Sequence, residues 1–137
     1  MPLNFQPDPG TLWMCDFDTG FMPPEMVKYR PVVVISPQPG WMSGLCTIVP
    51  LSTTPPIPVK PFHHLMDERS LPPGKLRQNE AWAKCDMLYT VSLSRLNRAT
   101  RRRTASAKFR VLDEDLNAIR ACVMIALGLD KSPDAGQ

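Results

Sequence analysis

The sequence predicts a mainly β fold, in which a small barrel-like sheet carries one helix from the C-terminal end of the chain. Three observations lead to this class. Short runs of β-branched and other apolar residues recur between turn-forming residues. Sixteen prolines in 137 residues, about twice ordinary usage, favour short strands joined by stiff loops over a helical bundle. Near the C-terminus, apolar residues recur at helical spacing.

Length and composition predict one domain. A chain of 137 residues with 43% apolar residues can build a single core, which we expect at about 10–129, followed by a flexible tail at 130–137. The sequence shows no leader pattern and no apolar run of about 18 residues, so we expect no membrane span and a cytoplasmic location. The four cysteines lack a C-x-x-C motif, and we expect buried free thiols rather than a zinc site.

The first two strands are expected at Thr11–Phe17 and Pro31–Ser36. Pro31 fixes its own φ and can open a strand without donating to the ladder. The apolar run Val32–Ile35 does not alternate with polar residues, so this strand should be covered on both faces. Arg30 therefore lies at the edge of a rigid strand, directly before its first residue, where a planar guanidinium can bind phosphate.

Weaker patterns follow along the chain. A third strand is expected at Cys46–Leu51, ending or bulging at Pro50. Phe62–Met66 indicates a short strand. Ala81–Val91 alternates polar and apolar residues, as in a strand with one solvent-exposed face. Ser92–Arg98 indicates one helical turn.

The last element is the clearest helix, and a weak strand at Lys108–Leu112 precedes it. Asp113 is a suitable N-cap, and the two acids after it favour a helix N-terminus. Gly128 is a natural stop one residue beyond the end. The helical spacing is carried by Leu116, Ile119, Val123 and Leu127.

Positive charge is concentrated in one stretch, although the net charge is only +3. No acid lies between Asp86 and Asp113, where seven basic residues occur. Such a stripe is typical of proteins that bind a phosphate backbone, and a solvated surface loop is the alternative. The seven are Arg95, Arg98, Arg101, Arg102, Arg103, Lys108 and Arg110.

Five segments in colinear order resemble the PemK/MazF family of toxin–antitoxin ribonucleases. They share short strand-and-turn patterns, and the resemblance spans residues 10–129. The segment 55–79 and the basic insert 99–108 depart from the family's pattern. The five segments are GTLWMCDFD at 10–18, RPVVVIS at 30–36, VPLSTT at 49–54, CDMLYTV with SRL at 85–96, and LGL at 127–129.

This resemblance implies a fold, an activity and catalytic residues. The fold would be an SH3-like or CcdB-like β-barrel. The activity would be cleavage of single-stranded RNA, without metal or cofactor, to 2′,3′-cyclic phosphate and 5′-hydroxyl ends. Arg30 matches the family's catalytic arginine, and either Ser52 or Thr53 matches its catalytic hydroxyl. Glu25 would orient the arginine or accept a proton, unless it is simply a solvated loop carboxylate.

The resemblance also implies partners: mRNA, a cognate antitoxin and a second copy of the chain in a homodimer. Trp41 would stack an unpaired base or cap the end of the barrel. His63 and His64 invite a general-base or metal-binding interpretation, with surface histidines as the alternative. The residues expected to bind RNA are Lys28, Trp41, Arg95, Arg98, Arg101, Arg102 and Arg103.

Two other functions compete with the ribonuclease. One is a non-catalytic, regulatory barrel that binds nucleic acid. The other is a gyrase-poisoning toxin of the CcdB type, which shares the fold and relies on an aromatic residue after the helix. Gly128–Gln137 contains no aromatic residue, which disfavours this second alternative.

The basic stretch generates a prediction about salt. Replacing Arg101–Arg103 with glutamine should flatten the plot of log affinity for single-stranded RNA against log salt by about 2, since each lost phosphate contact removes about 0.7 from the slope. Filter binding at several salt concentrations measures this slope. An unchanged slope would remove the stretch from the RNA-binding surface.

Overall fold

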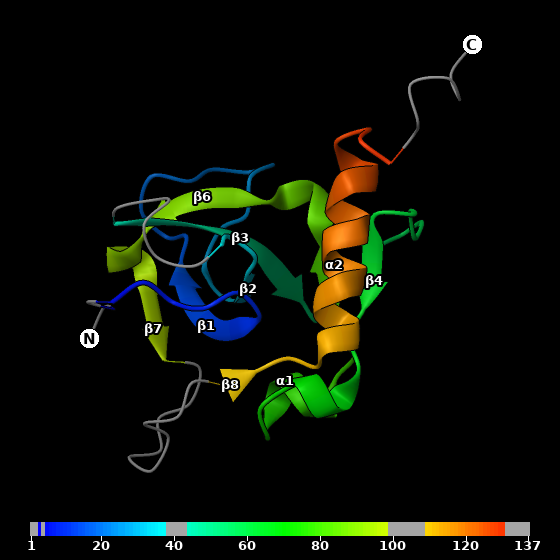
Figure 1. Cartoon of the computed structure of the whole chain (residues 1–137), viewed down its shortest axis with the longest axis horizontal. Helices are drawn as coiled ribbons and strands as arrows, with labels where there is room; N and C mark the ends of the chain where they lie inside the picture. Colours follow the sequence, from blue (N-terminus) through cyan, green and yellow to red (C-terminus); the bar gives the residue numbers. More distant parts are fainter. Residues whose placement is uncertain (1–2, 4, 38–43, 99–108, 131–137) are drawn as a thin grey trace.

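A computed structural model describes residues 3, 5–37, 44–98 and 109–130 of the chain (Figure 1). Its helices are α1 (Lys75–Gln78) and α2 (Asp113–Ala126), with short 3-10 turns at Glu68–Ser70, Cys85–Met87 and Leu93–Arg95. Its strands are β1 (Thr11–Asp16), β2 (Tyr29–Val34), β3 (Leu45–Ser52), β4 (His63–Leu65), β5 (Trp82–Lys84), β6 (Tyr89–Ser92), β7 (Leu96–Arg98) and β8 (Phe109–Arg110).

The eight strands form one antiparallel sheet in the order β4-β5-β3-β2-β1-β7, with β6 paired to β3 and β8 paired to β1. The sheet is not closed within the described residues. Helix α2 lies beside it, close to β4 (Figure 1). The predicted class, mainly β with a C-terminal helix, is confirmed.

Strand β2 is the centre of the core. Val32, Val33 and Val34 are all 0% exposed, so the run without polar alternation is covered on both faces, as predicted. Val33 belongs to a cluster on the side of α2, which we call the helix-side cluster. Val32 and Val34 belong to a second cluster on the opposite face, the far-side cluster, which also contains Cys15.

Helix α2 covers the sheet with the apolar stripe that the sequence predicted. Leu116, Ile119 and Val123 all join the helix-side cluster. The C-terminal stop is confirmed, because Gly128 has a φ of +73° and donates to the Ile125 carbonyl. The predicted N-cap is wrong by one residue. Leu112 occupies the N-cap, and Asp113 is already helical.

Three other predicted boundaries are wrong. Strand β3 does not end or bulge at Pro50, because it continues to Ser52 by pairing with β5. The expected strand Ala81–Val91 is broken by the turn Cys85–Met87 into β5 and β6, which pair with different parts of β3. Only the first part of Ser92–Arg98 is a helical turn, since its last three residues form β7 against β1.

The cysteines are free thiols, as expected. Cys15, Cys46 and Cys85 are buried, and Cys122 is partly buried on α2. Burial raises the pKa of Cys15 and of Cys46 to about 12. These two thiols therefore stay protonated in the folded protein at neutral pH.

Core packing by α2 generates the first stability prediction. Ile119→Ala should lower the free energy of unfolding by about 2–5 kcal/mol, because it removes a fully buried side chain and leaves a cavity. Urea denaturation measures the change. Met124→Ala, at a position 47% exposed on the same helix, is the control and should change it by less than about 0.5 kcal/mol. Equal losses would contradict the observed orientation of the helix.

The buried thiols generate a prediction about pH. Unfolded cysteine loses its proton near pH 9, whereas folded Cys46 keeps it up to about pH 12. The stability that Cys46 contributes is thus complete below pH 9 and lost as pH rises from 9 toward 12. In urea denaturation, Cys46→Ala should show a smaller loss of stability over that range than the wild type. Identical pH slopes would contradict this.

Candidate functional site

The candidate site begins where β2 and β3 separate. Their ladder ends at the pair Val32 and Pro50, and neither Pro31 nor Pro50 has an amide proton to donate. Beyond that pair β2 remains on β1, with Arg30 opposite Cys15. Strand β3 turns instead to β5, with Ser52 opposite Trp82. The predicted arginine and hydroxyls therefore lie at the same end of two diverging strands.

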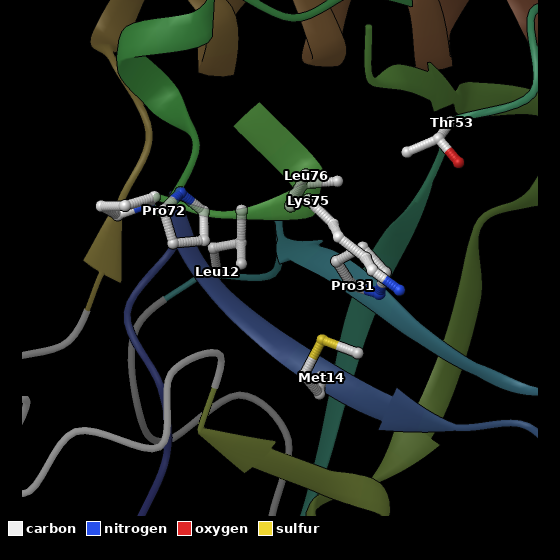
Figure 2. A pocket seen from close by; sticks show the side chains of 8 residues that line it. Leu12, Met14, Pro31, Thr53, Pro72, Lys75 and Leu76 are labelled. Carbon is white, nitrogen blue, oxygen red and sulfur yellow. The ribbon is translucent and has the colours of Figure 1, made fainter. Parts of the chain in front are cut away.

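A pocket of about 280 Å³ lies at this end of the sheet (Figure 2). Its floor and walls are mainly apolar, and Thr53 and Lys75 bring a hydroxyl and an ammonium group to it. In Figure 2, Lys75 reaches from α1 toward Pro31, and Thr53 stands at the end of β3. The lining residues are Leu12, Met14, Pro31, Thr53, Pro72, Pro73, Lys75 and Leu76.

Arg30 is half-buried at the start of β2. Arg30 and Ser52 each lie two residues beyond the last pair of the β2–β3 ladder, Val32 and Pro50. By the alternation of a strand, Arg30 is on the face of Val32 and the far-side cluster, whereas Pro31 faces the pocket. The Arg30 Nε donates to the Val27 carbonyl at 3.1 Å, and the two terminal nitrogens of the guanidinium carry further N–H donors.

The two candidate hydroxyls occupy different environments. Ser52 is 7% exposed, and its Oγ accepts from the Thr54 amide at 3.1 Å. By strand alternation it is on the same face as Ile48 and Arg30. Thr53 is exposed and lines the pocket. Both hydroxyls thus lie at the end of β3 where it separates from β2, and only Thr53 shares the pocket with Pro31.

Glu25 stabilises a turn. Its Oε1 accepts from the Met22 amide at 3.2 Å, and its own amide donates to the Met22 carbonyl at 2.9 Å. Within the described part of the chain, no ion pair joins Glu25 to Arg30. The carboxylate is exposed, in keeping with the solvated-loop alternative.

Comparison with known proteins identifies the family. A family model described as PemK-like, MazF-like toxin of type II toxin–antitoxin systems matches residues 8–127. The chain belongs to this family. The resemblance predicted from the sequence is thereby confirmed.

The chain is also similar to a relative in sequence and to solved structures in fold. The protein YifN of Escherichia coli K12 is 32% identical over 122 residues, which cover 72% of this chain and 77% of YifN. Among solved structures, MazF from Deinococcus radiodurans superposes with a TM-score of 0.63 at 20% identity, covering 91% of this chain and 99% of that one. A mycobacterial endoribonuclease, solved with its cognate antitoxin, gives 0.62 at 19% identity, covering 93% and 100%. The two solved structures establish that the fold is shared.

Lys28 and Arg95, two residues expected to bind RNA, hold the loop between β1 and β2. Lys28 is exposed and has a φ of +75°, and its carbonyl accepts from the Phe17 amide at 2.8 Å. Arg95 Nη1 donates to the carbonyls of Asp16 and Thr19 at 2.9 and 2.8 Å. Its guanidinium carbon lies 4.8 Å from the centre of the Phe21 ring. A role of either side chain toward RNA stays a prediction.

Arg98 is another residue expected to bind RNA. Arg98 is exposed at the end of β7, opposite Trp13 of β1. Trp41 and Arg101–Arg103 lie outside the described residues, as do most of the predicted tail and the basic insert.

His63 and His64 contact different partners from neighbouring positions of β4. His63 Nδ1 accepts from the Lys60 amide at 2.9 Å, and its Nε2 lies 4.0 Å from Asp86 Oδ1. Burial lowers the pKa of His63, and nearby Lys84 and Lys60 add to the effect. His64 Nε2 lies 2.8 Å from Asp115 Oδ1, so it is held by a buried carboxylate. Neither ring lines the pocket.

The described residues contain no group of three or more His, Cys, Asp or Glu side chains arranged to hold a metal ion. None of the helices that the structure describes combines the length and apolar character needed to cross a membrane.

Sequence reasoning missed one part of the site. Pro72, Lys75 and Leu76 form a wall of the pocket, yet in the sequence their segment stands out only as part of the departure at 55–79 from the family's pattern. The short helix α1 has four residues and no apolar periodicity, so its sequence carries little signal. Ser70, two residues before this wall, contacts Asp115 of α2, which is distant in sequence.

Proposed function

We propose that this toxin-family chain is an endoribonuclease that cleaves single-stranded RNA, in particular mRNA, in the cytoplasm. Cleavage would not require a metal and would leave 2′,3′-cyclic phosphate and 5′-hydroxyl ends. The observation that supports this most is that Arg30, Ser52 and Thr53 lie at the same end of β2 and β3, where the two strands diverge. Family membership supports the same activity.

In this reaction the ribose 2′-hydroxyl attacks the adjacent phosphorus, and the 5′-oxygen leaves. Negative charge accumulates on the phosphorane oxygens, and a donor aimed at those oxygens stabilises the transition state. The terminal nitrogens of Arg30 would form a bidentate contact with them. Because its Nε is held by Val27, the guanidinium would be oriented before substrate binds.

Ser52 is the hydroxyl that the strand register favours as Arg30's partner, since both are on the far-side face. It would donate to a phosphate oxygen while its lone pair accepts from Thr54. Thr53, which lines the pocket, would instead contact the nucleotide next to the cleaved bond. Glu25 would accept a proton only after releasing the Met22 amide.

Partners follow from the same proposal. The toxin would act as a homodimer whose shared groove binds RNA, and a cognate antitoxin would cover that groove with an extended acidic segment. The mycobacterial endoribonuclease of the same fold was solved with its antitoxin, which supports this type of partner. Arg98 and the basic stretch beyond it would extend the RNA track.

The first test is cleavage of a defined single-stranded RNA in the presence of EDTA. Wild-type protein should cut it, and Arg30→Ala should lower the rate at least about a hundredfold, since a transition-state donor is lost. Arg120→Ala removes an exposed arginine from α2 and is the matched control, which should keep full activity. Binding without cleavage by the wild type would favour the non-catalytic alternative.

The hydroxyls are compared in the same assay. Ser52→Ala should lower kcat, whereas Thr53→Val should mainly raise KM, because only the first side chain shares the face of Arg30. The 5′-hydroxyl end is identified by ligating the 3′ fragment, which should succeed only after treatment with a polynucleotide kinase. If Thr53→Val alone abolished turnover, the assignment of the two hydroxyls would be reversed.

A further inference from the structure

A buried carboxylate on α2 lies at the centre of a polar network outside the pocket. Asp115 is 4% exposed, in the first turn of the helix. Its Oδ1 lies 2.8 Å from His64 Nε2, and its Oδ2 accepts from the Asp67 amide at 3.1 Å and from the Ser70 hydroxyl. A buried charge is costly unless hydrogen-bonded, and here both oxygens are engaged.

The hydroxyl of Ser70 joins this carboxylate to the helix terminus. Ser70 is 0% exposed, and its Oγ accepts from the Leu112 amide at 2.8 Å while donating to Asp115. Leu112 is the N-cap and has no capping side chain of its own. A side chain from a distant segment therefore satisfies the helix N-terminus, where a local residue would ordinarily do so.

The segment held in this way leads directly into the wall of the pocket. Leu71, the next residue after Ser70, is 1% exposed and belongs to the helix-side cluster. Its carbonyl accepts from Arg77 Nε at 2.9 Å, which ties α1 to the same point. Pro72, Lys75 and Leu76, between those two residues, line the pocket with Thr53 (Figure 2).

We infer that Asp115 is a positioning residue for RNA: through Ser70 and the Asp67 amide it fixes the wall Pro72–Leu76 against which the substrate beside Thr53 is held. The inference rests on the proposed ribonuclease function. Asp115 does not line the pocket, so it acts through the wall and touches no reacting atom. The apolar wall and the Lys75 ammonium would contact a base and its phosphate.

The test compares Asp115→Asn with Glu114→Gln. Both remove one negative charge from the first turn of α2, but Glu114 is exposed. Asp115→Asn removes the charge and turns one of the two acceptor oxygens into a donor, so the one oxygen left cannot serve both the His64 side and the side of Ser70 and Asp67. We expect KM for RNA to rise about tenfold in Asp115→Asn with kcat changed less than about twofold, because wall contacts are lost and reacting groups stay in place. Glu114→Gln should leave both constants unchanged.

A second variant and a second measurement keep the outcome clear. Ser70→Ala removes only one hydroxyl, so it can be tested even if Asp115→Asn does not fold. It should also raise KM for RNA. Hydrogen exchange should accelerate at the amides of Asp67, Ser70 and Leu71 and not in β2. Exchange that accelerates evenly over the chain, or an unchanged KM, would mean that the network only stabilises the helix and would overturn the inference.

The two proposals fail in different ways. A wild-type protein that cuts no RNA would refute the nuclease, and with it the role of Asp115 toward RNA. In that case, faster hydrogen exchange confined to the amides of Asp67, Ser70 and Leu71 in Asp115→Asn would still show that the network holds the wall in place. If the wild type is active and both Asp115→Asn and Ser70→Ala have unchanged kinetics, only the positioning role is refuted.

Discussion

The end of the β2–β3 ladder constrains the whole site. Pro31 and Pro50 lie where the paired part of these strands ends, and neither can donate to a ladder. Beyond this point the two strands separate, one remaining with β1 and the other joining β5. The valines just beyond Pro31 are fully buried on both faces, so the backbone that carries Arg30 is anchored in the most rigid part of the sheet. A rigid strand that ends in an open edge places a cation at a surface without making that cation mobile.

Local patterns predicted the elements whose signal is contained in their own residues. The uninterrupted valines of β2 and the spacing of Leu116, Ile119 and Val123 in α2 reflect direct burial, and both were predicted correctly. Pro50 was misinterpreted, because the cost of proline in a strand depends on which neighbour needs its amide, and β3 changes neighbours there. The break at Cys85–Met87 has the same origin. Its residues alternate like one strand, but the two halves pair with different parts of β3.

The residues of the site also divide into those with a local sequence signal and those without one. Arg30 and the hydroxyls at 52 and 53 were found from short segments in a recognisable order. The pocket wall and the network around Asp115 were not, because they join residues of β4, the 67–71 segment and α2 that are far apart in sequence. Asp115 was interpreted with Glu114 as an acid that favours a helix N-terminus, which is correct but incomplete. Only the structure reveals that this acid faces inward, toward Ser70.

The pairing of β1 has a consequence for biosynthesis. β1 lies near the start of the chain, yet two of its partners, β7 and β8, are among the last strands to be synthesised. α2, which closes one face of the core, follows them. Contacts of such long sequence separation form late and make folding slow. A nascent chain that still lacks β7, β8 and α2 cannot complete its sheet and core, so these segments must be synthesised before the folded protein exists.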